Sequence, residues 1–200
     1  MTDIPQNETR ERILRVAEKL FMKRGFASVK LRDIAAEVGM RHASLYYYAP
    51  DGKEGLFVEV LKRSLTRYRE GIREAITATA ENLPAQMRAA ADWIIKQPPM
   101  DLNRMTDSDL PAIDSSKAAE LSKMAIESVT IAIMEALQAA ADRGEIAPMH
   151  DYQMAAMAFT VLIQSTHHIP DKIVEHQIPG GRQALGRDLV NMLLHGWLPR

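Results

Sequence analysis

The stretch IAAEVGMRHASLYYY, residues 34–48, reads as two short helices joined by a tight turn. Ile34 and Val38 are one helical turn apart, so they lie on one apolar face of the first helix. Glycine adopts positive φ without a Cβ clash, so we expect Gly39 to end that helix and form the turn. Leu45 in the second helix is then placed to pack back on Ile34 and Val38. The stretch therefore predicts two helices crossing at a steep angle.

The rest of the second helix is polar and aromatic. In a helix-turn-helix the second helix lies in the major groove, with its first residues at base edges and its flanks against phosphates. Arginine can bind a guanine edge or a phosphate, and tyrosine hydroxyls can bind phosphate. The stretch therefore predicts a DNA-reading helix, although a tight corner with merely solvated polar residues stays open for so short a motif. The outward residues are Arg41, His42, Ser44, Tyr46, Tyr47 and Tyr48.

Over roughly residues 8–70, including the flanks of this stretch, the chain resembles the TetR family of transcriptional regulators. The resemblance implies an all-α protein, with a three-helix helix-turn-helix DNA-binding domain at 8–54 and a helical effector-binding and dimerisation domain at 55–200. The matching pieces are Arg24-Gly25-Phe26, Arg32-Asp33-Ile34-Ala35, Val38-Gly39-Met40, Leu45-Tyr46-Tyr47-Tyr48 and Lys53-Glu54-Gly55-Leu56-Phe57.

The resemblance also implies which residues meet DNA. Family members bind it with the start of the second helix, the exposed side of the third and the lysine that opens the fourth. Arg41 and His42 stand at variable positions that usually help to choose the operator. The implied DNA-binding residues are Lys30, Arg32, Arg41, His42, Ser44, Tyr46, Tyr47, Tyr48 and Lys53.

The chain departs from the family pattern at two places. Tyr48-Ala49 replaces the usual His-Phe pair, so a phosphate donor becomes a phenol and an aromatic plug becomes a methyl group. The loop before Lys53 holds one residue more than the common form and reads Pro50-Asp51-Gly52. We expect local repacking at Ala49 and a shift of Lys53 relative to the phosphate backbone.

Composition indicates a packed globular protein. Of the 200 residues 46% are hydrophobic, and glycine and proline number only 10 each. Cysteine is absent, which excludes disulfides and thiolate chemistry. The polar start MTDIPQNETR has no apolar signal region, and no uninterrupted apolar stretch approaches the length of a membrane span, so we expect a cytoplasmic protein without a membrane partner.

Charge is distributed unevenly along the chain. Residues 1–73 hold 15 Lys and Arg against 10 Asp and Glu, a net charge of +5, whereas residues 74–200 hold 10 against 16, a net charge of −6. The basic end contains the helix-turn-helix pattern. A basic module favours salt-dependent contact with phosphates, and an acidic remainder is repelled by the duplex.

Helical periodicity extends over the whole chain, and no alternating strand pattern or internal repeat is evident. We expect a first helix over Thr9–Arg24, ended by Gly25, and a fourth that begins near Lys53. The latter keeps its period through Leu56, Phe57, Val60, Leu61, Ser64, Leu65, Tyr68, Ile72 and Ile76. The later expectations are helices over 83–97, 115–143 with Ser115 or Ser116 as cap, 152–168 with Asp151 as cap, and 182–197, with a long loop over 98–114 that holds at most one short helix.

The last two helices carry more apolar residues than one face needs, which predicts a homodimer; a monomer that buries both helices in its own core is the alternative. Two-fold dimers read palindromic operators, because one helix-turn-helix covers too few base pairs. The predicted interface residues are Met154, Phe159, Leu162, Leu189, Leu193 and Trp197.

Members of the family commonly hold a small molecule among their C-terminal helices, and its binding tilts or separates the DNA-binding heads. Methionine and aromatic side chains adapt to apolar ligands, although at helical spacing they are also ordinary core residues. The lining residues predicted for an unknown small-molecule effector are Met87, Trp93, Ile94, Met105, Met124, Met157, Phe159 and His167.

An enzyme is the main competing class. The chain has no Gly-x-Ser-x-Gly elbow, phosphate-binding glycine loop or HExxH pair, so we expect no catalytic residues. The neighbours His167 and His168 point about 100° apart on a helix, which suits neither a metal site nor a metal cofactor. A helical interaction protein without DNA binding is the second alternative. The sequence favours a homodimeric transcriptional regulator, in the form of a repressor that leaves its operator when an effector binds.

Overall fold

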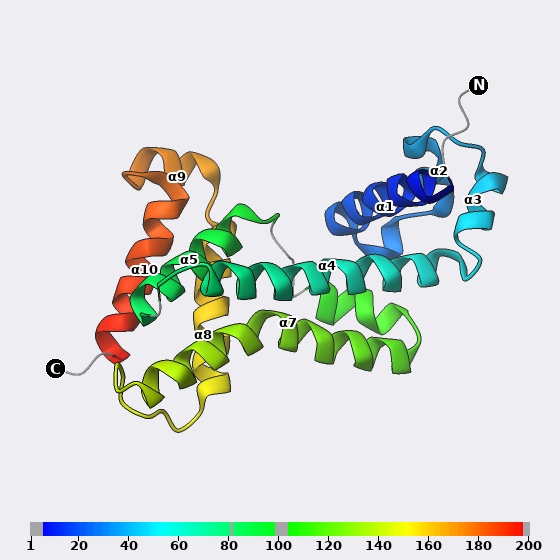
Figure 1. Ribbon diagram of the computed structural model, residues 1–200. Helices are drawn as coiled ribbons and strands as arrows, with labels where there is room; N and C mark the ends of the chain where they lie inside the picture. Colours follow the sequence, from blue (N-terminus) through cyan, green and yellow to red (C-terminus); the bar gives the residue numbers. More distant parts are fainter. Residues whose placement is uncertain (1–5, 81, 99–103, 198–200) are drawn as a thin grey trace. The chain divides into compact units, whose positions relative to one another are not determined.

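The computed structural model describes residues 6–80, 82–98 and 104–197. Within these ranges the chain is helical and contains no strand (Figure 1), so the predicted all-α class is confirmed. The elements are α1 (Gln6–Ser28), α2 (Leu31–Val38), α3 (His42–Tyr48), α4 (Gly52–Thr77), α5 (Leu83–Lys96), η1 (Met105–Asp109), η2 (Leu110–Ala112), α7 (Ser115–Asp142), α8 (Tyr152–Ser165), η3 (Thr166–His168), α9 (Asp171–Gln177) and α10 (Gly181–Trp197).

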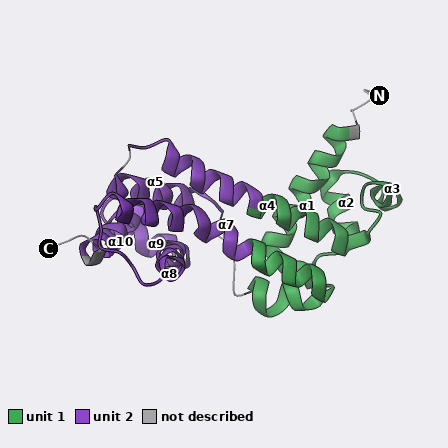
Figure 2. Ribbon diagram, turned by 60° about the horizontal axis from the view of Figure 1, so that its bottom comes forward, with its two compact units in different colours: residues 1–65, 101–124 green, residues 66–100, 125–200 purple. Residues whose placement is uncertain are grey.

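The chain divides into two compact units (Figure 2). Unit 1 comprises residues 1–65 and 101–124, and unit 2 comprises residues 66–100 and 125–200. The divisions fall inside α4 and α7 rather than between residues 54 and 55, because the first half of α4 packs its apolar face with the preceding helices. The boundary at 54/55 stays a prediction.

Unit 1 is built around the apolar faces of α1 and of the first half of α4. Three aromatic rings form its centre: Phe57 lies 5.2 Å from Phe21 and 5.0 Å from Phe26 between ring centroids. Two bidentate ion pairs join the same helices, Arg10 to Glu59 and Arg63 to Glu11, with nitrogen–oxygen distances of 2.6–2.8 Å.

The helical path of α1 is interrupted at Gly25, whose φ of 76° and ψ of 164° are not helical. The predicted end of the first helix is therefore confirmed as a break, although the chain resumes a helical turn through Ser28. The fourth helix is also as predicted, since all nine residues of its expected apolar series, from Leu56 to Ile76, are buried.

Unit 2 is a bundle in which α5 packs against α8 and α10. Its fully buried side chains include Met87 and Ile94 on α5, Phe159 on α8 and Val190 on α10. α5 and α10 approach closely at Gly186, where a Cβ atom would overlap the side chain of Ile95 on α5. The smallest residue is therefore required at that crossing.

Three local expectations need correction. The cap of α7 is Asp114 rather than Ser115 or Ser116, because its Oδ1 accepts the N–H groups of Ser116 at 3.0 Å and Lys117 at 3.2 Å. The short helix α9 lies in a segment for which no helix was expected. The helix predicted over 152–168 ends as α8 at Ser165 and continues only as the turn η3, although its predicted cap Asp151 is confirmed by a 2.9 Å bond from the Met154 N–H.

One helix, α7, is long and apolar enough to meet the length and hydropathy criterion for a membrane span. The stretch is interrupted by charged residues such as Glu127 and Glu135, so it is not the uninterrupted apolar stretch that the sequence was expected to lack. Half of the relevant window is buried within the protein, at positions such as Val129, Ile133 and Leu137 that recur with helical period. This burial is typical of a core helix.

Candidate nucleic-acid interface

The turn between α2 and α3 has the predicted geometry. Gly39 adopts φ 77° and ψ 35°, the left-handed conformation that glycine tolerates best. Its N–H donates to the Ala36 carbonyl at 3.1 Å, and the next N–H, of Met40, donates to the Ala35 carbonyl at 2.9 Å. These bonds satisfy carbonyls at the end of α2, so the chain turns into α3 within three residues.

α3 is anchored by one buried side chain. Leu45 is fully buried, as are Ile34 and Val38 on α2, which confirms the predicted packing of the two helices. The rest of α3 faces outward: Tyr46 is 51% exposed and Tyr47 is 69% exposed. A short helix with so little buried surface depends on the neighbouring elements for its position.

The exposed side of α3 carries both aromatic rings and polar side chains. The rings of His42 and Tyr46 lie 5.2 Å apart, and those of Tyr47 and Tyr48 meet edge to face at 5.1 Å. Arg41, at the start of the helix, is exposed, as are His42 and Ser44, whereas Tyr48 is half-buried. The predicted residues of the third helix are thus brought onto one element, where they can meet a groove and its phosphates.

The two residues at the start of α2 that are predicted to contact DNA are exposed to solvent. The backbone N–H of Lys30 donates to Asp33 Oδ2 at 3.0 Å, which caps α2, and the Lys30 side chain is exposed. Arg32 is also exposed, and its Nε lies 3.8 Å from Asp33 Oδ1, which is a loose ion pair. Both cations are therefore accessible to a phosphate.

Lys53 differs from every other predicted DNA-binding residue. Its ammonium donates to the Phe26 carbonyl at 3.0 Å and lies 4.0 Å from the centre of the Phe26 ring. The side chain is half-buried, and its charge is directed into unit 1. The sequence offered no signal for this contact, because 27 residues separate the two partners.

The two departures from the family pattern have simple local structures. Ala49 is buried, and its N–H donates to the Leu45 carbonyl at 3.0 Å, so the methyl group closes the end of α3. The longer loop forms a turn in which the Gly52 N–H donates to the Ala49 carbonyl at 3.0 Å and Gly52 has a φ of 66°.

The residues predicted to line an effector pocket are divided between the units. Met105 and Met124 belong to unit 1, and the other six belong to unit 2. In unit 2 the Nε2 atom of His167 lies 3.4 Å from the Ile94 carbonyl oxygen, which brings two of the six together. Burial is the main cause that lowers the pKa of His167 below its ordinary value.

Polar groups that the sequence analysis did not single out are buried in unit 2. The hydroxyl of Tyr68, Oε1 of Gln86 and Nε2 of Gln164 have no hydrogen-bond partner among the described residues. Burial raises the pKa of Tyr68 to about 12, and its ring meets Trp93 edge to face at 5.0 Å. Periodicity predicted that Tyr68 is buried but gave no signal of its unpaired hydroxyl.

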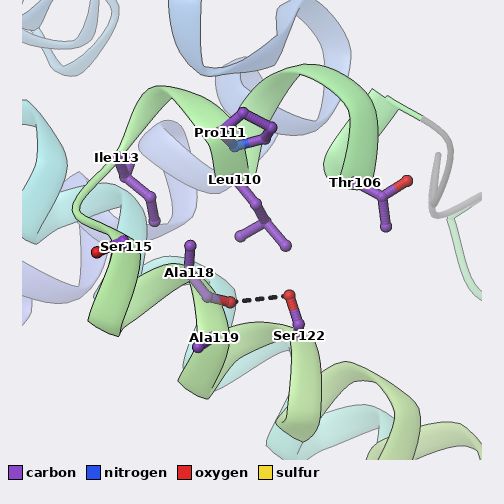
Figure 3. Close-up of a pocket in the computed structure, with 8 residues that line it drawn as sticks. All are labelled: Thr106, Leu110, Pro111, Ile113, Ser115, Ala118, Ala119 and Ser122. Atoms are coloured by element: carbon purple, nitrogen blue, oxygen red, sulfur yellow. Dashed lines mark hydrogen bonds between the residues drawn. The ribbon is translucent and has the colours of Figure 1, made fainter.

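A cavity of about 330 Å³ lies in unit 1 between the η1–η2 segment and the start of α7 (Figure 3). None of its lining residues was predicted, because the segment reads as a polar loop in the sequence. Three hydroxyl-bearing side chains and five apolar ones surround it: Thr106, Leu110, Pro111, Ile113, Ser115, Ala118, Ala119 and Ser122.

The predicted dimer residues have different degrees of burial. Met154 is 64% exposed, Phe159 is fully buried within the single chain, and Leu162, Leu189 and Leu193 are half-buried. The side chain of Trp197 lies outside the described residues.

Comparison with known proteins confirms the resemblance. The profile of "Bacterial regulatory proteins, tetR family" matches residues 13–60, which contain α2, α3 and most of the unit 1 core. The chain is 36% identical over 84 residues, 40% of its length, to the HTH-type transcriptional regulator LmrA of Bacillus subtilis (strain 168). That match spans 45% of LmrA, so it concerns less than half of the relative.

Solved structures share the fold over nearly the whole chain. A putative transcriptional regulator from Saccharomonospora viridis, solved in complex with choline, superposes with a TM-score of 0.73 at 20% identity and covers 98% of this chain and 100% of its own. AibR, solved in complex with isovaleryl coenzyme A and operator DNA, superposes with a TM-score of 0.67 at 20% identity and covers 92% and 97%. These likenesses show the fold.

Proposed function

We propose that this chain, which belongs to the TetR family through residues 13–60, is a transcriptional regulator that binds a specific operator in double-stranded DNA. The observation that carries the proposal is the surface of α3, where two exposed tyrosines, Arg41, His42 and Ser44 surround a single buried anchor. LmrA, which this chain matches over 84 residues, is a transcriptional regulator, and AibR was solved with operator DNA.

Selection of bound duplexes from a random pool, followed by titration of a fluorescent copy at two ionic strengths, tests DNA binding. A regulator recovers one preferred sequence and binds it less tightly as the salt concentration rises. Absence of salt-dependent binding to any duplex would favour the helical interaction protein instead.

Substitutions on α3 test DNA recognition separately from the fold and the oligomeric state. Arg41→Ala and Tyr46→Ala are expected to weaken binding of the selected duplex while leaving the oligomeric state unchanged. If Arg41 and His42 choose bases, then exchanging them alters the preferred sequence in a second selection; an identical preference would count against that role.

The proposal includes a homodimer on a palindromic operator. On α8 the exposed residues Met154, Ala158 and Val161 follow one another at helical spacing, and Met192 on α10 is 60% exposed. Apolar side chains gathered on helix faces in this way are typical of a surface that a partner covers.

Charged substitutions test the dimer. Met154→Glu combined with Val161→Glu is expected to yield monomers in analytical ultracentrifugation. Ile173→Glu, on α9, is the matched control, because Ile173 is also an exposed apolar residue at 42% but lies outside these two faces. A dimer that survives the double substitution would argue for another interface.

The proposal also includes a small-molecule effector, bound in unit 2, that releases a repressor from its operator in the cytoplasm. The buried polar atoms of Tyr68, Gln86 and Gln164 support such a ligand, because groups of this kind normally have hydrogen-bond partners. Deletion of the gene is expected to raise transcription from a promoter that contains the selected site. A fall in transcription would identify an activator.

A further inference from the structure

Phe26 follows Gly25, the residue at which α1 is interrupted, and its peptide groups cannot all be satisfied by a regular helix. Side chains from two other elements bind them instead. The Phe26 N–H donates to Asp109 Oδ1 at 2.7 Å, and the Phe26 carbonyl accepts from Lys53 Nζ at 3.0 Å and, over a longer 3.4 Å, from the Val29 N–H. Since Phe26 is buried, its N–H would be costly to leave unpaired, and without Lys53 its carbonyl would keep only the long bond from Val29.

Lys53 holds Phe26 in a second way. Its ammonium lies 4.0 Å from the centre of the Phe26 ring, within the range of a cation–π interaction. That ring packs against Phe57, one helical turn after Lys53 on α4, at 5.0 Å. The first turn of α4 is therefore fixed to the break in α1 by an ammonium group and an aromatic contact together.

Asp109 binds the other backbone group of Phe26, its N–H. It is buried, and its Oδ2 accepts from Arg104 Nε at 3.3 Å. Arg104 Nη2 also donates to the Met22 carbonyl at 2.6 Å, near the break in α1. A Cβ at Gly25 would lie 3.0 Å from Asp109 Oδ1, so the arrangement also requires glycine at that position.

We propose that Lys53 is a positioning residue rather than a phosphate-binding one. With Asp109 it forms a clamp on the backbone N–H and carbonyl of Phe26, and this clamp fixes the position of α3. The inference rests on the proposed function, since its consequence is DNA affinity. Only residues 49–52 separate α3 from Lys53, so the first turn of α4 sets the position of the reading helix.

Salt dependence distinguishes the two roles in the full-length protein. With a fluorescent duplex selected by the wild type, Lys53→Met is expected to lower affinity by about tenfold or more, because the variant loses the ammonium's bond to the Phe26 carbonyl and its contact with the Phe26 ring. The slope of log affinity against log salt is expected to stay near that of the wild type. A lost phosphate contact would reduce that slope by about 0.9, and this result would overturn the proposal.

Lys30→Met is the matched control. Lys30 is an exposed lysine of the same unit, at the start of α2, so its removal is expected to reduce the salt slope if it binds phosphate.

At Asp109, loss of charge and loss of the clamp are expected to change DNA affinity in opposite directions. Removing a negative charge strengthens binding to a polyanion when charge alone matters, whereas loss of the clamp weakens it. Asp109→Ala is expected to bind the duplex more weakly than the wild type. If circular dichroism shows that this variant does not fold, the hydrogen–deuterium exchange measurement on Lys53→Met decides the proposal in its place. A folded variant that binds as tightly as the wild type, or more tightly, would overturn the proposal.

Hydrogen–deuterium exchange of the free protein tests the clamp without DNA. Peptides that contain Phe26 and the first turn of α4 are expected to exchange faster in Lys53→Met than in the wild type or in Lys30→Met. Unchanged exchange would contradict the clamp. If the wild type binds no duplex at all, the proposed function fails, and the exchange result still decides the clamp.

Discussion

Two tyrosines on α3, in unit 1, are exposed to solvent, whereas the tyrosine in the second half of α4, in unit 2, is buried. On α3, Tyr46 and Tyr47 are 51% and 69% exposed, whereas Tyr68, in the unit 2 part of α4, is only 4% exposed. The exposed rings add little to the core, so they are free to contact an external partner. The buried hydroxyl of Tyr68 has no partner among the described residues and lowers stability unless something binds it.

The difference separates two environments that the proposed function assigns to different partners. The α3 surface offers polar and aromatic groups to a large external partner, at little cost in folding. The interior of unit 2 holds a few polar atoms in an apolar environment, which is the usual composition of a small-molecule site. Substitutions at the two regions are therefore expected to differ in size and in the property they affect.

The largest expected effect follows from truncating the buried ring. Tyr68→Ala removes an aromatic side chain that packs on Trp93 and is expected to lower the free energy of unfolding by about 3–5 kcal/mol. Urea unfolding followed by circular dichroism measures the change. Tyr47→Ala is the control on α3, with an expected change within about 0.5 kcal/mol. Equal losses in the two variants would remove the contrast between the regions.

Leu45→Ala is expected to have an intermediate effect, a loss of about 2–3 kcal/mol. Leu45 is fully buried, but α3 is short and can move to fill part of the cavity, which reduces the cost. Because the same movement displaces the exposed tyrosines, binding of the selected duplex should fall more steeply than stability. Urea unfolding and DNA titration on the same sample measure both, and an affinity equal to the wild type would mean that Leu45 does not position α3.

Local features of the α2–α3 turn could be predicted from the sequence. Ile34, Val38, Gly39 and Leu45 lie within twelve residues, so their spacing alone determines which of them meet. The buried series of α4 was predictable for the same reason, since helical period specifies a face without reference to the partner that covers it.

Features that depend on distant residues could not be predicted. Asp109 lies 83 residues from Phe26 and in a stretch of Asp, Asn and Ser that reads as a solvated loop. Lys53 matches the family position for a phosphate contact, and only the folded chain shows its carbonyl and ring partners. α9 was missed because its seven residues bury only Val174, which leaves no apolar period to detect.

A smaller effect is expected when only the hydroxyl of Tyr68 is removed. Tyr68→Phe keeps the ring against Trp93 and deletes a polar atom that has no partner among the described residues. The free energy of unfolding should stay unchanged or rise by up to about 1 kcal/mol. If urea unfolding instead shows that the free energy of unfolding falls by more than about 1 kcal/mol, the hydroxyl is hydrogen-bonded in solution.

The most subtle expected effect is the titration of the same hydroxyl. Burial raises the pKa of Tyr68 to about 12, above its ordinary value of 10.0, so the folded state holds this proton more tightly than the unfolded chain does. The resulting contribution to stability is complete below pH 10 and is lost as the pH rises from 10 towards 12. In the folded protein, phenolate absorbance should show a late step near pH 12 that Tyr68→Phe lacks. A late step that persists in Tyr68→Phe would assign it to another tyrosine and remove the contrast between α3 and the interior of unit 2.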